Sequence, residues 1–133
     1  MTLSLVFRIQ AVIMGIFGAA ALLAPASMMG GFNVEATSGA VDIMRGMSLM
    51  VIAVAYISWQ MPTWAGDNLK SVGMFFAVWH VIYALVSGYQ ISFGAFPSDV
   101  AHLLGNFGPD VILAIIFFWK SRGDAQVREK IKK

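Results

Sequence analysis

Four apolar stretches dominate this sequence, and each is long enough to cross a lipid bilayer. They cover residues 3–24, 41–60, 69–93 and 98–120. A membrane-spanning helix needs about 20 mostly apolar residues at ~1.5 Å of rise per residue. The segments between the stretches are rich in glycine, proline, asparagine or aspartate, which interrupt helices. Residues 1–121 are therefore predicted to form an all-α integral membrane domain, a four-helix bundle with up-down-up-down topology.

The composition excludes an ordinary soluble domain. Hydrophobic residues make up 59% of the 133 residues and charged residues 12%, whereas soluble domains carry about 45–50% and about 25%. The chain has no cysteine, so disulfides and thiolate metal sites are excluded. It also has no glycine-rich phosphate loop, zinc-protease helix motif or nucleophile elbow. These observations favour a role other than catalysis.

The basic residues gather at the C-terminus, in a tail formed by residues 122–133. The tail carries five basic and two acidic residues: Arg122, Asp124, Arg128, Glu129, Lys130, Lys132 and Lys133. Lysine and arginine near the ends of spans mark the cytoplasmic side. Because four spans return the chain to the side where it started, both termini are expected to be cytoplasmic. The tail is interpreted as an anchor to lipid phosphates, not as a nucleic-acid patch.

The first stretch has a second explanation, a secretory signal. Ala24-Pro25-Ala26 matches the small-residue pattern of a signal-peptidase site. However, the apolar run before it exceeds the about 7–15 residues of a signal core, and its positive charge, Arg8, lies inside the run. We therefore expect this stretch to be retained as the first span.

Each span gathers small and polar residues on one stripe, because positions i, i+3, i+4 and i+7 share a helix face. The stripes are Arg8, Ala11, Gly15, Gly18 and Leu22; Asp42, Arg45, Gly46, Leu49, Ala53, Tyr56 and Gln60; Gly73, Ala77, His80, Tyr83, Ala84 and Ser87; and Asp99, His102, Leu103, Asn106, Asp110, Ala114 and Phe117. Close packing and interhelical hydrogen bonds hold membrane bundles together. The predicted polar seam consists of Asp42, Arg45, Gln60, His80, Asn106 and Asp110.

Arg45 and Asp110 are the charged residues whose placement matters most. Arg45 follows Asp42 by about one helical turn, so the two side chains can pair along the helix while Arg45 points into the bundle. Asp110 is the other candidate partner. Its depth depends on Pro109, and we favour a continuous, kinked fourth helix over one that begins afresh there, because neighbours can satisfy the carbonyl that a proline frees.

His80 is predicted to lie near the bilayer centre, about eleven residues from the cytoplasmic end of its span. In one interpretation it is a neutral imidazole hydrogen-bonded to Tyr83, Asp110 or a backbone carbonyl. In the other it contacts a ligand head group, transfers a proton or binds a metal. The sequence leaves both open.

Two sets of residues carry side chains that can bind metals, but neither is predicted to form a metal site. Methionines 44, 47 and 50 carry thioethers that suit Cu(I), but they turn away from the Asp42 stripe, and methionine is a common apolar filler. His80 and His102 could bind haem iron, but no attachment motif accompanies them. No metal site is predicted.

The chain resembles the small four-helix bacterial membrane proteins of the DoxX-like neighbourhood. The resemblance covers nearly the whole chain and is carried by LLAPASMMGGF, VDIMRGMSLM, WHVIYALVSG and FFWKSR. It implies a multi-pass protein of the bacterial inner membrane, and some of these relatives are associated with quinone-linked oxidation. No catalytic residue can be carried over. A weaker likeness, through Arg45-Gly46 and His80, is to eukaryotic four-helix proteins that tether sterol-synthesis enzymes, and it keeps a scaffolding role open.

The predicted function is that of a non-enzymatic accessory or scaffolding subunit, or of a binder of a small apolar ligand. The residues predicted to bind such a ligand are His80, Tyr83, Arg45 and Asp110. The alternatives are a quinone-linked redox component of the membrane and a subunit of an oligomeric transporter. The expected partners are membrane lipid and other membrane subunits or further copies of the chain, with no nucleic acid. No cofactor is predicted, apart from a quinone or another lipid in the ligand site.

Overall fold

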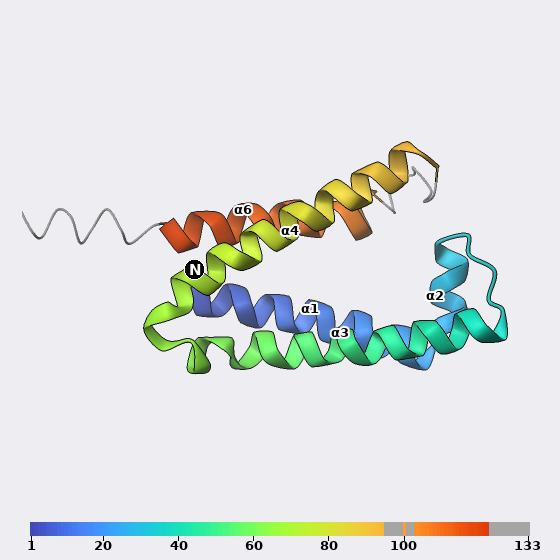
Figure 1. Ribbon diagram of the computed structural model, residues 1–133, viewed down its shortest axis with the longest axis horizontal. Coiled ribbons are helices and arrows are strands. Elements are labelled where there is room, and N and C mark those ends of the chain that lie inside the picture. The colour runs from blue at the N-terminus through green and yellow to red at the C-terminus, as the bar shows by residue number, and fades with distance from the viewer. Residues whose placement is uncertain (95–99, 101–102, 123–133) are drawn as a thin grey trace, which may run out of the picture. The chain divides into compact units, whose positions relative to one another are not determined.

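The computed structural model describes residues 1–94, 100 and 103–122, without the side chain of Asn106, and Figure 1 shows the order of its elements. Most of the described residues are helical, and none of them lies in a strand. The elements are α1 (Leu3–Leu23), α2 (Pro25–Gly31), α3 (Ser38–Trp64), η1 (Gly66–Asn68), α4 (Leu69–Ser92), η2 (Leu103–Phe107) and α6 (Gly108–Arg122). The predicted all-α class is confirmed.

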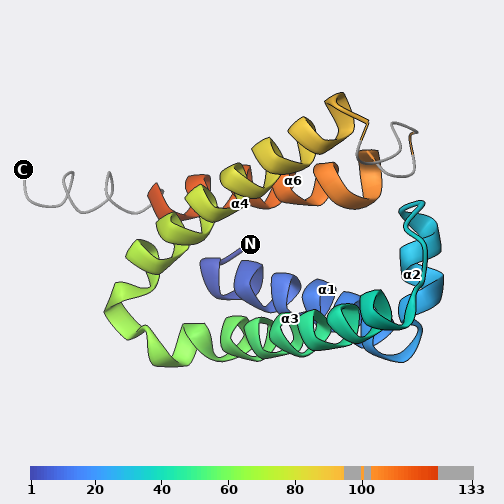
Figure 2. The ribbon, with the colours of Figure 1, turned by 45° about the vertical axis from the view of Figure 1, so that its right-hand side comes forward.

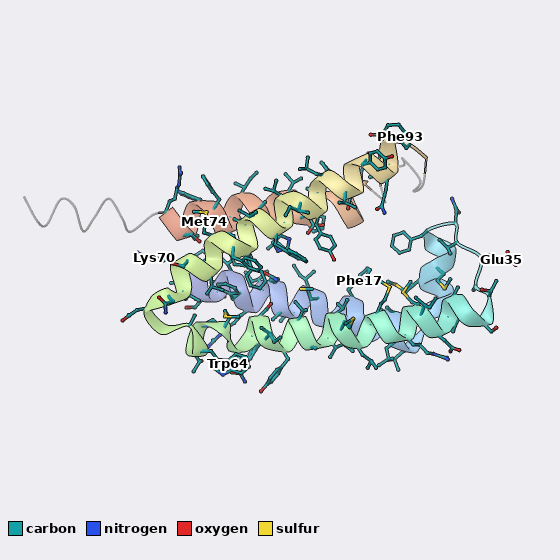
Figure 3. The ribbon with its side chains drawn as sticks, in the orientation of Figure 1. Phe17, Glu35, Trp64, Lys70, Met74 and Phe93 are labelled. Carbon is teal, nitrogen blue, oxygen red and sulfur yellow. The ribbon has the colours of Figure 1, made fainter. Side chains whose placement is uncertain are left out.

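Four helical segments are long and apolar enough to cross a membrane. They are Leu3–Leu23, Ser38–Trp64, Gly66–Ser92 and Leu103–Arg122. Many of their large apolar side chains are exposed, as Figure 3 illustrates along each helix, and lipid is the solvent in which such exposure is favourable. The prediction of four helices long and apolar enough to cross a membrane is confirmed for the residues that the structure describes, and the chain has the features of a multi-pass membrane protein.

The second span is longer than the predicted 41–60 at both ends. At its start, the hydroxyl oxygen of Thr37 accepts a hydrogen bond from the backbone N–H of Ala40 at 3.3 Å. This contact satisfies one of the N–H groups that the first turn of a helix leaves free, so α3 begins at Ser38. At its other end, α3 continues through Pro62 to Trp64. Pro62 has no N–H to donate to the carbonyl of Ser58, so the helix gives up one backbone hydrogen bond in its last turns.

A short helix, α2, lies in the segment that was predicted to be a loop between the first two spans. Pro25 occupies its first turn, where a missing N–H costs nothing and a fixed φ favours the helix. The helix ends at Gly31, and Asn33 then adopts a positive φ of 55°. Asparagine tolerates this left-handed conformation better than most residues. Proline and glycine in this segment therefore mark the two ends of α2, in addition to separating α1 from α3.

The chain divides into two compact units, and the first consists of residues 7–60. In this unit α1 and α3 run side by side in opposite directions, as Figures 1 and 2 both show. Gly18 allows the two helices to come close: a Cβ at this position would lie 2.8 Å from Ile52 Cγ1 and 3.3 Å from the carbonyl oxygen of Ser48. The pair is therefore packed through small residues, as expected where lipid offers no hydrophobic drive.

The second unit consists of residues 1–6 and 61–133, and its described core is the pair α4 and α6. Three contacts between these helices are Gly73 with Ser121, Phe76 with Phe117, and His80 with Asp110. Residue numbers rise along α4 as they fall along α6, so the two helices are antiparallel. Gly73 faces Ser121 so closely that a Cβ there would collide with the serine hydroxyl.

The fourth span changes its helical pitch beside Pro109. Residues 103–107 form a π-helical segment, and α6 follows directly from Gly108. The wider π turn loosens the backbone where the proline ring would crowd the carbonyl of the preceding turn. The helix therefore passes through Pro109 without a break, and Asp110 lies in the first turn of α6.

Candidate ligand-binding site

The candidate site is built on a contact between His80 and Asp110, the Nδ1 of the first and the Oδ1 of the second lying 2.7 Å apart. His80 lies near the middle of α4, between the end that Lys70 and Met74 mark in Figure 3 and the end that Phe93 marks. Asp110 lies in the first turn of α6. The antiparallel packing of the two helices brings these residues together although 30 positions separate them in the chain.

Both side chains of the pair are shielded from the surroundings. The His80 side chain is 8% exposed and that of Asp110 is 21% exposed. Ionisable groups within spans are costly in hydrocarbon, so they pair with one another or mark functional sites. The pair thus compensates its own polarity.

Phe117 holds the imidazole in place from one side. Its ring stacks on that of His80, with the centroids 5.8 Å apart and the planes at 13°. Phe117 is fully buried and also contacts the ring of Phe76 at 5.7 Å. Asp110 and Phe117 are seven residues apart, so they share one face of α6. This face gives His80 both a hydrogen-bonding partner and a stacked apolar ring.

The second ring nitrogen of His80, Nε2, is buried and has no hydrogen-bond partner among the described residues. Buried polar atoms in native structures nearly always have a partner, and an unpaired one needs an explanation. Leaving such a group unpaired costs about 1–3 kcal/mol. Nε2 is therefore the atom of this pair with an unused hydrogen-bonding position for a ligand or an ordered water.

The other two predicted ligand-binding residues do not take part in the contact between His80 and Asp110. Tyr83 is 51% exposed, and its ring contacts that of Trp79 at 5.5 Å. Arg45 belongs to the other unit, where its guanidinium lies 3.6 Å from Asp42, with the two side chains 54% and 77% exposed. The predicted pairing along the helix is present, as an exposed contact of the kind that contributes about 0–1 kcal/mol.

The buried face of α3 differs from the predicted polar seam. Its buried residues are Ser48, Ala55 and Ser58, while Asp42 and Arg45 are exposed and Gln60, which donates to the Tyr56 hydroxyl at 3.4 Å, is partly exposed. The predicted stripe left out the serines. They are the residues small enough for the close approach of α1, which is why their face is the one that packs. For the remaining predicted positions, Asp99, His102 and the side chain of Asn106 lie outside the described residues.

Sequence reasoning missed a buried polar contact between α1 and α3. The amide nitrogen of Gln10 donates to the hydroxyl of Ser58 at 3.3 Å, and both residues are almost completely buried. The amide oxygen of Gln10 is buried without a partner in the part of the chain that the structure describes. The sequence feature that indicates this contact is the amide side chain of Gln10 within an apolar span, since polar side chains in such spans usually form hydrogen bonds across helices.

Comparison with known proteins identifies no family for this chain. No family model, curated protein or solved structure matches the chain. The resemblance to the DoxX-like neighbourhood therefore stays a prediction. The residues that the structure describes also contain no group of three histidine, aspartate or glutamate side chains placed to hold a metal ion.

Proposed function

We propose that this chain is a multi-pass protein of the bacterial inner membrane, with both termini cytoplasmic, that binds a small lipophilic molecule through His80 and Asp110. The observation that carries the proposal is the buried Nε2 of His80, which has no hydrogen-bond partner among the described residues. Its other nitrogen is already held by Asp110. The polar head of a ligand would complete the hydrogen bonding of the imidazole.

The surroundings of the pair favour a lipophilic ligand. The site lies between two helices of membrane-spanning length, and aromatic rings of Phe76 and Phe117 pack beside it. Ligand sites are typically apolar with a few well-placed polar groups. Nε2 itself is buried, so binding requires neighbouring side chains to move aside.

A purely structural role of the pair is the competing explanation. In that case the pair would hold α4 against α6, as an accessory or scaffolding subunit requires, and Nε2 would bond to a trapped water. Burial and hydrogen bonding alone suit both roles. The two roles differ in whether a small molecule accompanies the folded protein.

The test compares molecules that co-purify with the wild-type protein and with a double variant, His80→Phe with Asp110→Leu. This variant keeps a ring on Phe117 and leaves neither partner unpaired, so it should stay folded. We expect mass spectrometry of organic extracts to find a molecule bound to the wild type and to the control Tyr83→Phe but not to the double variant. If the extracts are the same for folded samples of all three proteins, ligand binding at this pair is refuted.

A further inference from the structure

We infer that Arg8, held against Trp59, binds the phosphate of an anionic phospholipid at the end of the helix pair where α1 begins and α3 ends. This site is separate from the contact between His80 and Asp110, so the inference goes beyond the proposed function. The guanidinium carbon of Arg8 lies over the indole ring of Trp59, 5.5 Å from the ring centroid. A cation at this distance over an indole face is attracted by the ring.

Arg8 faces outward from within an apolar stretch of the first span. It is exposed, and so are Leu5 and Val12, which lie about one turn before and one turn after it on the same face of α1. Trp59 is exposed as well, at 47%. Because α1 is long and apolar enough to cross a membrane, this surface meets lipid, where an uncompensated charge is costly. The guanidinium therefore needs an anion within its reach.

The described part of the chain supplies no anion to Arg8. No ion pair or hydrogen bond joins its guanidinium to another described residue. α1 contains no acidic residue, and the acidic residue of α3, Asp42, lies about 26 Å along the helix from Trp59. The N–H groups of the guanidinium are thus available to a ligand. Their planar fork matches phosphate oxygens, which arginine binds through two parallel hydrogen bonds.

The depth of Arg8 suits a lipid phosphate. α1 begins at Leu3, about 8 Å along the helix from Arg8, and α3 ends at Trp64, about 8 Å from Trp59. Since α1 is about 31 Å long and the hydrocarbon core about 30 Å thick, both residues lie close to the edge of the core. Side chains lean toward the N-terminus of their helix, which directs Arg8 toward the nearby membrane surface. Its long stem then carries the charged end to the level of the head groups.

The charges around Arg8 favour a lipid with a net negative charge. A zwitterionic head group brings an ammonium together with its phosphate, and neither α1 nor this end of α3 carries a carboxylate to receive that ammonium. An anionic head group neutralises the guanidinium and adds no cation. A soluble phosphate ester lacks the acyl chains that would cover the exposed apolar side chains of Leu5 and Val12. The ligand that meets both conditions is an anionic phospholipid.

Native mass spectrometry of the full chain, released from nanodiscs with equal amounts of phosphatidylglycerol and phosphatidylethanolamine, tests the inference. The measured quantity is the mean number of lipids of each kind that stay on the protein. Arg8→Gln removes the cation. Arg45→Gln is the matched control, because it removes the same charge from an exposed arginine that already has a carboxylate partner, Asp42. The basic tail is present in every variant, so its contribution cancels in the comparison.

We expect the wild type and Arg45→Gln to retain about one phosphatidylglycerol more per protein than Arg8→Gln, since one guanidinium fork binds one phosphate. Retention of phosphatidylethanolamine should be the same in all three. Trp59→Leu, made alone and together with Arg8→Gln, tests the role of the indole. It should lower retention of phosphatidylglycerol only where Arg8 is present, whereas general damage to the fold would lower retention in both backgrounds.

Four outcomes would overturn the inference. Equal retention of phosphatidylglycerol by the wild type and Arg8→Gln would show that Arg8 binds no lipid phosphate. An equal loss in Arg45→Gln would show general attraction between charges in place of a site. An equal loss of both lipids in Arg8→Gln would refute the preference for an anionic head group. Displacement of phosphatidylglycerol from the wild type by dimethyl phosphate, a soluble diester, at the same concentration as the lipid would show that the acyl chains contribute nothing.

Discussion

The contact between His80 and Asp110 should show a large coupling energy in a double-mutant cycle. His80→Phe keeps the ring that stacks on Phe117 but leaves the Asp110 carboxyl, 21% exposed, without its partner. Removing one member of a buried pair costs about 3–5 kcal/mol, and we expect about 3 because Asp110 is partly exposed. Asp110→Leu leaves both imidazole nitrogens unpaired and should cost about 2 kcal/mol.

The double variant should cost only about 0–2 kcal/mol, because replacing both partners by apolar groups of similar shape leaves no polar atom unpaired. The coupling energy is then at least about 3 kcal/mol, the upper end of the usual range for residues in contact. The assay is the free energy of unfolding, measured by circular dichroism as sodium dodecyl sulfate is titrated into mixed micelles. Tyr83→Phe is the matched control on the same helix, since its ring contact with Trp79 survives the change. Single effects that add to within about 0.5 kcal/mol would show that the 2.7 Å contact contributes no coupling.

Two further predictions concern packing and orientation. Gly18→Ala should destabilise the protein by about 1–3 kcal/mol, since its Cβ would crowd Ile52 and the carbonyl of Ser48. The control Gly46→Ala, whose Cβ would meet nothing within 4 Å, should be neutral or stabilising by up to about 1 kcal/mol. Equal melting temperatures for the two variants would contradict the close approach of α1 and α3 at Gly18. The chain has no cysteine, so single variants Glu35→Cys and Asp67→Cys can each be labelled with a membrane-impermeant maleimide. In intact spheroplasts, whose inner membrane is exposed, the cysteine at position 35 should react at once, and the cysteine at position 67 only after the membrane is opened. The reverse pattern would show that the proposed topology is inverted.

The third span was the most predictable, because its small and polar residues fall on one face. Helical spacing placed six residues together, and all of them are buried except Tyr83, which is 51% exposed: Gly73, Ala77, His80, Tyr83, Ala84 and Ser87. Asp110 was also among the partners considered for His80. Spacing could not choose Asp110 over Tyr83, since both were within reach. That choice depends on how α6 is rotated against α4, which is a property of packing between two helices.

The second span was less predictable for a physical reason. In a membrane the outer surface of a helix is apolar, so hydrophobic periodicity gives little indication of which face packs. The face with the charged residues Asp42 and Arg45 was predicted to point into the bundle, but these two residues pair near the start of α3 and are exposed. Ser48 and Ser58, on the face that approaches α1, carry the buried hydroxyls. Size was a better indicator than charge, because a short side chain is what allows two backbones to come close.

The π-helical segment before Pro109 is a place in the fourth span where the chain can lose one residue without changing the register of the helix that follows. A π turn holds about one residue more than an α turn. Deleting one residue from 103–107 would let the segment close to α pitch, while Asp110 and Phe117, which lie beyond it, keep their register against α4. A deletion between Asp110 and Phe117 would instead rotate one of them by about 100° relative to the other and separate the carboxylate from the ring that covers the same histidine.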